Sequence, residues 1–476
     1  DWLNMIYVRL KVARSLLEES GILFMSIDDN ECQNLQLVAN EIFGEECFAG
    51  KVTVLCNPKG RSQDKFLATC HEYLLIYSKS PLEKGDLNVP KSSDDIQSDY
   101  PFEDEGGVYR ELELRNTHRE FGKFNRPNLF YPFYYSKDGQ LSLENTHNAV
   151  EILPLWPDGF EGCWTWGKEK AKESSANLVA KKVNGQWKVY RKAYASDDGG
   201  VPTKQLKSIW SEKRHHTEKG QKAFNELFDT KGKIFQSPKS LDLILDCIDM
   251  CQSDDMIVMD FFAGSGTSSH AVLASNVRDN ANRRFIAVQI PEVVEPTSEA
   301  GKNGFETISQ ISMERIRRAA KAMRVESPNS HGDLGFKVFK LDSSNIRAWN
   351  PDATNLEQSL LDHAEHLVEG RSEQDILYEL LLKRGVDLTV PIEEKKIAGK
   401  TVYSIGFGVL FACLDDKIGK DEIEPLAQGI AAWHKELEPA SDTQVVFRDS
   451  AFADDIAKTN MTAILEQNGI ANVRSL

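Results

Sequence analysis

The sequence predicts an α/β protein in which a β-rich insert interrupts the first domain and a separate α/β domain follows. Three observations lead to this prediction. Apolar strands alternate with helices of 3.6-residue apolar spacing, both before residue 80 and after residue 231. Between them, residues 81–230 are rich in Asn, Ser, Gly, Pro and aromatic residues and show only short strand patterns. From residue 341 onward, thirteen Lys and Arg stand against twenty-four Asp and Glu, which sets this part of the chain apart by charge.

The first eighty residues are predicted to form the first half of an α/β domain. Apolar residues recur at helical spacing through 2–19, and Gly21 ends that helix. Residues 22–27 lack polar alternation, which is typical of a fully buried strand. A second helix follows, and we expect further strands at 52–55 and 73–77.

The α/β pattern returns in residues 231–325, after an insert (81–230) without a long amphipathic helix. The expected elements are helix 241–251, strand 256–262, helix 267–277, strand 284–290 and a long Arg-rich helix at 308–323. Residues 326–476 are predicted to form the acidic C-terminal domain. Its strand candidates are 335–341, 401–407 and 444–447.

Composition limits the possible partners. The 57 Lys and Arg against 73 Asp and Glu give a formal charge of −16, so any contact with nucleic acid requires a local basic patch. Apolar runs stay far below the ~18 residues of a membrane span. Eight cysteines without CxxC spacing favour a reducing, cytoplasmic compartment over a disulfide scaffold or zinc site. Because the first residue is Asp1 and not Met, we expect the sequence to begin inside a longer protein.

The strongest local signal is a glycine turn between a strand and a helix. Gly264 and Gly266 let the backbone approach a ligand, and the helix N-terminus offers N–H groups to a carboxylate or phosphate. Asp260, at the strand end, is a candidate to hold an ammonium or hydroxyl group. A tight connection without a ligand remains the alternative. The dinucleotide fingerprint is incomplete, because Ser269 replaces its third glycine and Gln289 replaces its acidic residue.

The motif DFFAGSGT at 260–267 resembles the S-adenosylmethionine-binding motif of DNA amino-methyltransferases. Further segments resemble the modification subunits of type III restriction–modification systems. These segments are Gly21–Glu31, His71–Lys79, Arg126–Pro132, Arg283–Glu292, Asp333–Asn350 and Asp449–Asn460. The resemblance implies a doubly wound, Rossmann-like methyltransferase sheet formed by 1–80 and 231–325. It also implies a β-rich target-recognition insert and a separate C-terminal α/β domain for assembly.

The resemblance implies adenine N6 methylation of a short asymmetric site in double-stranded DNA, with S-adenosylmethionine as cofactor. It also implies a helicase–nuclease restriction subunit and a second copy of the chain as partners. The cofactor-binding residues implied are Asp260, Phe262, Ala263, Gly264, Ser265, Gly266, Thr267, Gln289, Ser237 and Lys239. Lys239 would meet the methionine carboxylate, unless it is merely an exposed lysine near a helix start. Gln289 would bind ribose hydroxyls, unless it only caps its strand.

The catalytic Asp-Pro-Pro-Tyr of this family does not occur in the sequence, and its expected place is upstream of residue 2. We therefore assign no catalytic residue and expect 1–476 alone to be inactive. Asp28, Asp29 and Glu31 follow a core strand, at an edge of the sheet where ligands tend to bind, so they are candidates to line the target pocket. The alternative is that Asp29 or Asn30 caps the next helix. A non-catalytic S-adenosylmethionine- or DNA-binding protein and an NAD-dependent oxidoreductase remain alternatives.

Candidate DNA contacts are cations that stand among aromatic residues, because cations neutralise phosphates and aromatic rings stack on bases. They are Lys59 and Arg61 in one loop, and Lys188, Arg191, Lys192, Lys213 and Arg214 in the insert. The alternative is a solvated basic surface. Trp164 and Trp166 are predicted to pack in a small β core, whereas His215 and His216 are predicted to lie at the surface.

Overall fold

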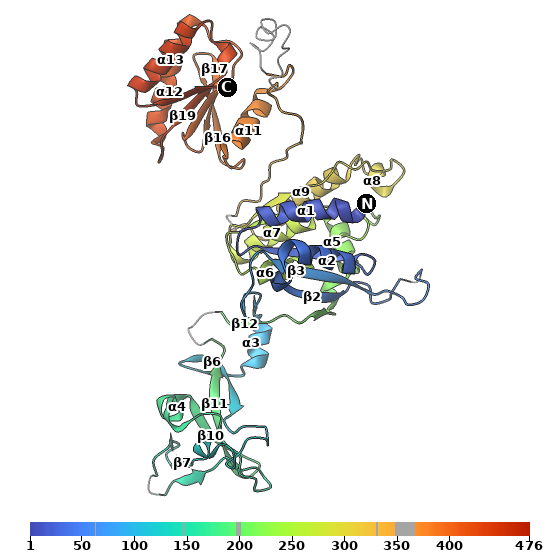
Figure 1. Cartoon of the computed structure of the whole chain (residues 1–476), viewed down its shortest axis with the longest axis vertical. Coiled ribbons are helices and arrows are strands. Elements are labelled where there is room, and N and C mark those ends of the chain that lie inside the picture. Colours follow the sequence, from blue (N-terminus) through green and yellow to red (C-terminus); the bar gives the residue numbers. More distant parts are fainter. Residues whose placement is uncertain (62, 146–147, 197–200, 330–331, 348–366) are drawn as a thin grey trace. The chain divides into compact units, whose positions relative to one another are not determined.

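The computed structural model describes residues 1–61, 63–145, 148–196, 201–329, 332–347 and 367–476 (Figure 1). The chain divides into two compact units, Asp1–Leu334 and Gly335–Leu476. Within the described ranges, every helix is too short or too polar to cross a lipid bilayer.

The first unit begins with a four-stranded sheet in the order β1-β3-β2-β13. The central strand β3 runs antiparallel to β1 and β2, and β13 is parallel to β2. Helices α1 and α2 pack on this sheet, and the core between them contains Leu10, Leu35, Leu75 and Tyr77. The bounds are α1 Trp2–Leu16, β1 Ile22–Ile27, α2 Cys32–Phe43, β2 Phe48–Leu55, β3 His71–Ser78 and β13 Ile209–Trp210.

Strand β1 is less buried than its apolar sequence predicts. Only Met25 of its six residues is fully buried, because β1 lies at the edge of the sheet. The apolar composition correctly indicated a core strand, but it could not show which strands have a neighbour on both sides.

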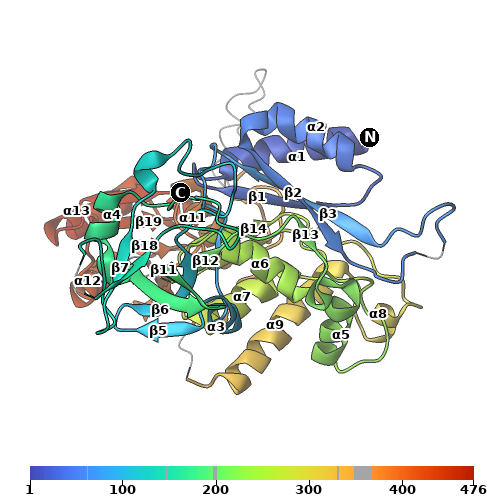
Figure 2. The same ribbon diagram turned by 90° about the horizontal axis from the view of Figure 1, so that it is seen from below.

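The segment after the insert forms a second sheet of two parallel strands, β14 and β15. Helices α6 and α7 pack against these strands, and α9 packs on α7 (Figure 2). Ile244 of α6 packs in the cores of both sheets, so α6 joins them. The strands thus belong to two hydrogen-bonded sheets, where the resemblance implied one doubly wound sheet. The bounds are α6 Leu241–Met250, β14 Ile257–Asp260, α7 Thr267–Asp279, β15 Arg284–Ala287, α8 Glu299–Lys302 and α9 Ile308–Glu326.

The insert is built from short strands around a core that includes Phe133, Trp164 and Val189. The core position of Trp164 is confirmed, and its indole N–H donates to the Tyr131 carbonyl at 2.7 Å. Trp166 packs partly buried against the same core. The bounds are β4 Val89–Pro90, α3 Ser93–Asp99, β5 Phe102–Asp104, β6 Gly107–Glu113, β7 Phe133–Tyr135, β8 Leu141–Ser142, β9 Val150–Ile152, α4 Lys168–Glu173, β10 Leu178–Val183, β11 Gln186–Tyr194 and β12 Thr203–Lys204.

The insert strands form sheets in the orders β10-β11-β6-β5, β8-β7-β9 and β12-β4. The expectation of no long amphipathic helix before residue 230 was wrong. Helix α5 (Thr217–Phe228) buries Phe224 and Phe228, which stack at 4.3 Å between ring centroids. Its apolar stripe is short, and the many lysines around it hide the helical period.

The second unit contains a five-stranded sheet in the order β16-β17-β18-β19-β20. The expected strand at 335–341 is wrong. This segment has no regular secondary structure, and Val338, Phe339 and Leu341 remain exposed. The bounds are α11 Glu373–Arg384, β16 Ile392–Ile397, β17 Lys400–Ile405, β18 Leu410–Cys413, α12 Ile423–Leu437, β19 Gln444–Phe447, α13 Asp455–Gln467 and β20 Asn472–Ser475.

Candidate functional site

Asp260 organises the glycine turn from within. One of its carboxylate oxygens accepts the Phe262 N–H at 3.0 Å, and the other accepts the Ser268 hydroxyl at 2.7 Å. The strand end is thereby tied to the first turn of α7. The carboxylate expected to hold a ligand's ammonium or hydroxyl is thus already bonded to the chain, so it shapes the turn.

Gln289 also belongs to the turn. Its amide oxygen accepts the Gly264 N–H at 2.7 Å, and its amide nitrogen donates to the Ile290 carbonyl at 3.1 Å. Ala263 N–H donates to the Val288 carbonyl at 3.1 Å, so the end of β15 supports the turn at two points. From the sequence, Gln289 was expected either to bind ribose hydroxyls or to cap its strand. Its hydrogen bond to the Gly264 N–H was not among these expectations.

The two glycines have different surroundings. Both have positive φ, +52° at Gly264 and +74° at Gly266, where an L side chain is strained. A Cβ added at Gly264 would lie 3.6 Å from the Phe235 ring, which is an ordinary contact distance. A Cβ added at Gly266 would lie only 2.6 Å from Ser312 Oγ of α9. Packing against α9 therefore requires a glycine at position 266, and the expected approach of both glycines to a ligand stays a prediction.

Arg315 of α9 lies behind the turn and is almost fully buried. Its guanidinium donates to Ser265 Oγ at 2.9 Å and to Thr267 Oγ1 at 2.6 Å. Burial lowers the pKa of Arg315 to about 10, and burial with the adjacent Arg315 charge lowers the pKa of His270 to about 3. Sequence reasoning noted an Arg-rich helix but not this arginine, because nothing in the sequence links it to the turn.

Two features of the turn remain free for a ligand. Helix α7 has Gly266 at its N-cap and no side-chain cap, so its first-turn N–H groups are not satisfied by a capping side chain. Phe262 keeps 53% of its surface exposed. Ala263, Ser265 and Thr267 are buried and support the turn from below. The turn therefore offers backbone donors and one aromatic surface.

The segment before α6 lies beside the turn. Phe235 lies within 3.6 Å of the Cβ position of Gly264. Lys239 forms an ion pair with Glu72 at the start of β3, which connects the segment before α6 with the first sheet. Ser237 has φ +53° and donates its N–H to Gln221 at 3.2 Å. Sequence reasoning missed Glu72, which lies far away in the chain.

The residues after β1 face the beginning of β3. His71 Nε2 lies 3.8 Å from Asp29 Oδ1 and 3.0 Å from the Tyr73 hydroxyl. The capping expectation for Asp29 or Asn30 is wrong, because the N-cap of α2 is Glu31 and makes no side-chain capping bond. The Asn30 N–H donates instead to Asp28 at 3.1 Å.

Strand β11 carries three of the predicted DNA contacts, but on both faces. Lys188 is 3.2 Å from Glu113, and Lys192 is 2.5 Å from Asp104. Since strand side chains alternate, Arg191 lies on the opposite face, with its guanidinium 5.9 Å from the Trp166 ring centroid. These cations do not form one patch, and acidic partners neutralise two of them.

The segment between β13 and α5 carries the remaining insert cations. Lys213 is exposed, whereas Arg214 pairs with Asp246 of α6 at 2.7 Å. The surface placement of His215 is wrong. It is buried, stacks on Trp210 at 5.0 Å between ring centroids, and has Nε2 2.7 Å from Asp246. The sequence could not show this, because Asp246 comes from a different helix.

Lys59 and Arg61 lie in the loop between β2 and β3. Lys59 is exposed, and Arg61 lies 4.0 Å from Glu72, the partner of Lys239. This places one candidate DNA-binding loop next to the candidate cofactor site.

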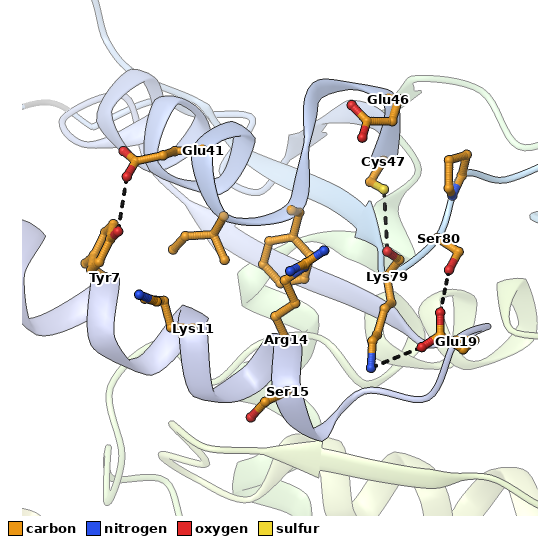
Figure 3. A pocket seen from close by; sticks show the side chains of 13 residues that line it. Tyr7, Lys11, Arg14, Ser15, Glu19, Glu41, Glu46, Cys47, Lys79 and Ser80 are labelled. Atoms are coloured by element: carbon orange, nitrogen blue, oxygen red, sulfur yellow. Dashed lines mark hydrogen bonds and ion pairs between the residues drawn. The ribbon is translucent and has the colours of Figure 1, made fainter.

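A separate pocket lies between α1 and α2 (Figure 3). Two contacts join side chains of its lining: Lys79 pairs with Glu19 at 3.4 Å, and the Tyr7 hydroxyl donates to Glu41 at 3.1 Å. The pocket contains none of the predicted site residues. Lys79 and Glu19 flank the amino-terminal end of β1, away from Asp28 at its carboxyl end.

The DNA methylase family profile matches residues 1–299. The chain is 30% identical over 411 residues to the type III restriction-modification enzyme EcoPI Mod subunit of Escherichia phage P1, covering 84% of this chain and 62% of that protein. It is 32% identical to the type II methyltransferase M.KpnI of Klebsiella pneumoniae, covering 66% of this chain and 73% of that protein. The StyLTI Mod subunit of Salmonella typhimurium is 32% identical, over 71% of this chain and 48% of that protein.

These relatives confirm the resemblance to type III modification subunits over most of the chain. The chain spans about three fifths of the length of the EcoPI Mod subunit. With a family match across more than half of its residues, the chain belongs to the DNA methylase family.

Proposed function

We propose that this chain carries the S-adenosylmethionine-binding and DNA-recognition parts of an adenine N6 DNA methyltransferase, the modification subunit of a type III restriction–modification system. The observation that carries the proposal is the preorganised glycine turn. Asp260, Gln289 and Arg315 hold it in place from within the protein. Its free groups are the uncapped N-terminus of α7 and the ring of Phe262.

These groups fit S-adenosylmethionine by their chemistry. The cofactor has a carboxylate, which suits free helix N–H groups and the positive end of the α7 dipole. Lys239 follows Phe235, which lies beside Gly264, and it would meet a carboxylate in exchange for its present partner Glu72. Phe262 offers an aromatic surface to the adenine ring. When bound, the cofactor supplies an activated methyl group.

The residues of the turn would orient the cofactor without large rearrangement. Asp260 and Gln289 already have their hydrogen-bond partners, so they fix the backbone that faces the ligand. Arg315 lies behind the turn without a carboxylate partner among the described residues, so its charge adds to the positive potential at the start of α7. The residues that would orient the target amine of the base are not among those identified in 1–476.

Double-stranded DNA is the proposed substrate, because the EcoPI and StyLTI relatives are modification subunits. The proposed contacts are Lys59, Arg61, Lys188, Arg191, Lys192, Lys213 and Arg214. Among them, Lys188, Lys192 and Arg214 would exchange their present acidic partners for phosphates. The acidic second unit is proposed to serve assembly with a second copy and with a helicase–nuclease restriction subunit. A cytoplasmic location follows for a protein that modifies DNA in the cell.

Calorimetric titration with S-adenosylmethionine and with NAD tests the cofactor directly. The expected result is saturable binding of S-adenosylmethionine and none of NAD. A Phe262→Ala variant should weaken the binding, whereas Phe124→Ala, which removes an exposed phenylalanine of the insert, should not. Binding of NAD alone would contradict the proposal. Binding of S-adenosylmethionine that is indifferent to Phe262 would place the cofactor away from this turn.

A further inference from the structure

The described residues of the loop between β2 and β3, 56–61 and 63–70, project from the sheet (Figures 1 and 2). Its base is closed by hydrogen bonds from the N–H groups of Cys56 and Asn57 to the Cys70 carbonyl, at 3.1 and 2.9 Å. Higher up, Arg61 N–H donates to the Thr69 carbonyl at 3.0 Å. The loop starts where β2 ends and returns where β3 begins, next to the carboxyl end of β1.

The internal contacts of the loop hold its outer part in place. Asp64, its one acidic residue, accepts the Thr69 N–H at 2.8 Å. This hydrogen bond lowers the pKa of Asp64 and occupies its carboxylate within the loop. Gly60 has φ +70°, and a Cβ there would lie 2.6 Å from Ala68. The two sides of the loop therefore pack closely.

Two large apolar side chains stand outward on this loop. Phe66 keeps 87% of its surface exposed and Leu67 keeps 84%. Burial of a side chain of this size stabilises a protein by ~1.5–3 kcal/mol. Because Phe66 and Leu67 are exposed, they do not contribute this stabilisation to the fold. An exposed apolar pair of this kind is typical of a surface that meets a partner.

The surroundings of this pair are cationic. Lys65 Nζ lies 5.1 Å from the Phe66 ring centroid, and Lys59 is exposed without an ion-pair partner in the described part of the chain. With Asp64 occupied, the loop presents positive charge around an apolar tip. A partner that covers this loop should therefore offer an apolar space with negative charge beside it. A DNA duplex does so, with phosphates beside the space between two base pairs.

The base of the loop is joined to the candidate cofactor site. Arg61 lies 4.0 Å from Glu72, and Glu72 pairs with Lys239. Lys239 follows Phe235, which packs beside Gly264 of the glycine turn. A duplex that meets the loop therefore lies at the edge of the first unit where the cofactor is proposed to bind.

We propose that Phe66 and Leu67 form a wedge that enters a DNA duplex at one base step, while Lys59 and Lys65 contact the flanking phosphates. The wedge fills the space that an extruded target base leaves in the stack, which lowers the cost of unstacking. This rests on the proposed function, because it takes DNA as the substrate. It adds the residues that open the duplex.

The test uses the 1–476 protein and two duplexes, which differ only in a central abasic site. No recognition sequence is needed, because the measured quantity is the ratio of the two dissociation constants. The unchanged protein should bind the abasic duplex about tenfold more tightly, since its cavity is already open. In Phe66→Ala/Leu67→Ala this ratio should fall to about one. Both residues are exposed, so the fold should be retained, which circular dichroism checks.

Two control variants separate the wedge from general binding. Phe124→Ala removes another exposed phenylalanine, 70% exposed in the insert, and should keep the tenfold ratio. Lys59→Ala should weaken binding to both duplexes equally and reduce the log–log salt slope by ~0.9.

The outcomes distinguish this inference from the function on which it rests. If the double variant keeps the tenfold ratio, or the unchanged protein shows no preference, DNA does not meet this pair and the wedge is refuted. If the protein binds neither duplex, both the wedge and the proposed DNA substrate are refuted. A ratio that collapses only in the double variant supports the wedge.

Discussion

An alanine at position 266 should destabilise the first unit more than an alanine at position 264. Both substitutions place a Cβ in left-handed backbone, with φ +74° and +52°, which costs ~1–2 kcal/mol. At Gly266 the new Cβ would also lie 2.6 Å from Ser312 Oγ, whereas at Gly264 the nearest atom is 3.6 Å away. Overpacking of this kind adds ~1–3 kcal/mol. The expected losses of unfolding free energy are therefore ~2–5 kcal/mol for Gly266→Ala and ~1–2 kcal/mol for Gly264→Ala.

A second substitution isolates the contact with α9. Ser312→Ala removes the hydroxyl, after which the nearest remaining atom is the Ser312 carbonyl oxygen at 3.2 Å. The double variant Gly266→Ala/Ser312→Ala should therefore recover most of the overpacking energy, giving a coupling of ~1–3 kcal/mol. The same Ser312→Ala change combined with Gly264→Ala should show no coupling.

The assay is calorimetric unfolding of the whole chain with and without S-adenosylmethionine. The transition that the ligand shifts identifies the unit that binds it. Equal losses at positions 264 and 266, or no coupling to Ser312, would show that α9 does not pack against the turn as described. A Gly266→Ala variant that keeps full stability but loses the ligand would show that Gly266 makes room for the cofactor and not for α9.

Three further predictions concern the charges of the site and the completeness of the chemistry. Lys239→Gln should weaken S-adenosylmethionine binding by about tenfold or more, because a charge-assisted bond is worth ~1.5–3 kcal/mol. The control Glu72→Gln should not weaken this binding. If calorimetry gives Lys239→Gln the same affinity as the unchanged protein, Lys239 is merely a surface lysine. The pKa of His270 is lowered to about 3 from 6.5, so the unfolded chain takes up a proton that the folded chain rejects. Stability should therefore fall as the pH drops from 6.5 toward 3, by up to ~2 kcal/mol at pH 5, and a His270→Gln variant that keeps the same pH slope would contradict this cause. Purified 1–476 should bind DNA without transferring methyl groups, because it contains no Asp/Asn-Pro-Pro-aromatic run to orient the exocyclic amine of the target base. Transfer of a radiolabelled methyl group to DNA would show that unassigned residues perform the chemistry.

The sequence by itself determined the features whose signals are local. The apolar periods predicted helices α1, α2, α6, α7 and α9 and strands β1, β3 and β14 to within a few residues. The glycine turn was predicted because strand, glycines and helix follow one another in eight residues. Helices and turns are set by neighbouring residues, so a short window contains the physical cause. The family resemblance extended this to the expected cofactor and substrate.

Only the tertiary structure decided which side chains meet. Glu72 and Lys239 are 167 positions apart, and Arg315 reaches Ser265 across 50 positions, so no local pattern could pair them. The same reason explains why His215 was misplaced, because its burial depends on Asp246 of another helix. Gly266 gained a second role in the same way, because a Cβ at this position would meet Ser312 of the distant helix α9. These contacts form because segments that are distant in the sequence pack together. The free energy of a buried polar side chain depends on its hydrogen-bonding partner, and the sequence alone does not identify that partner.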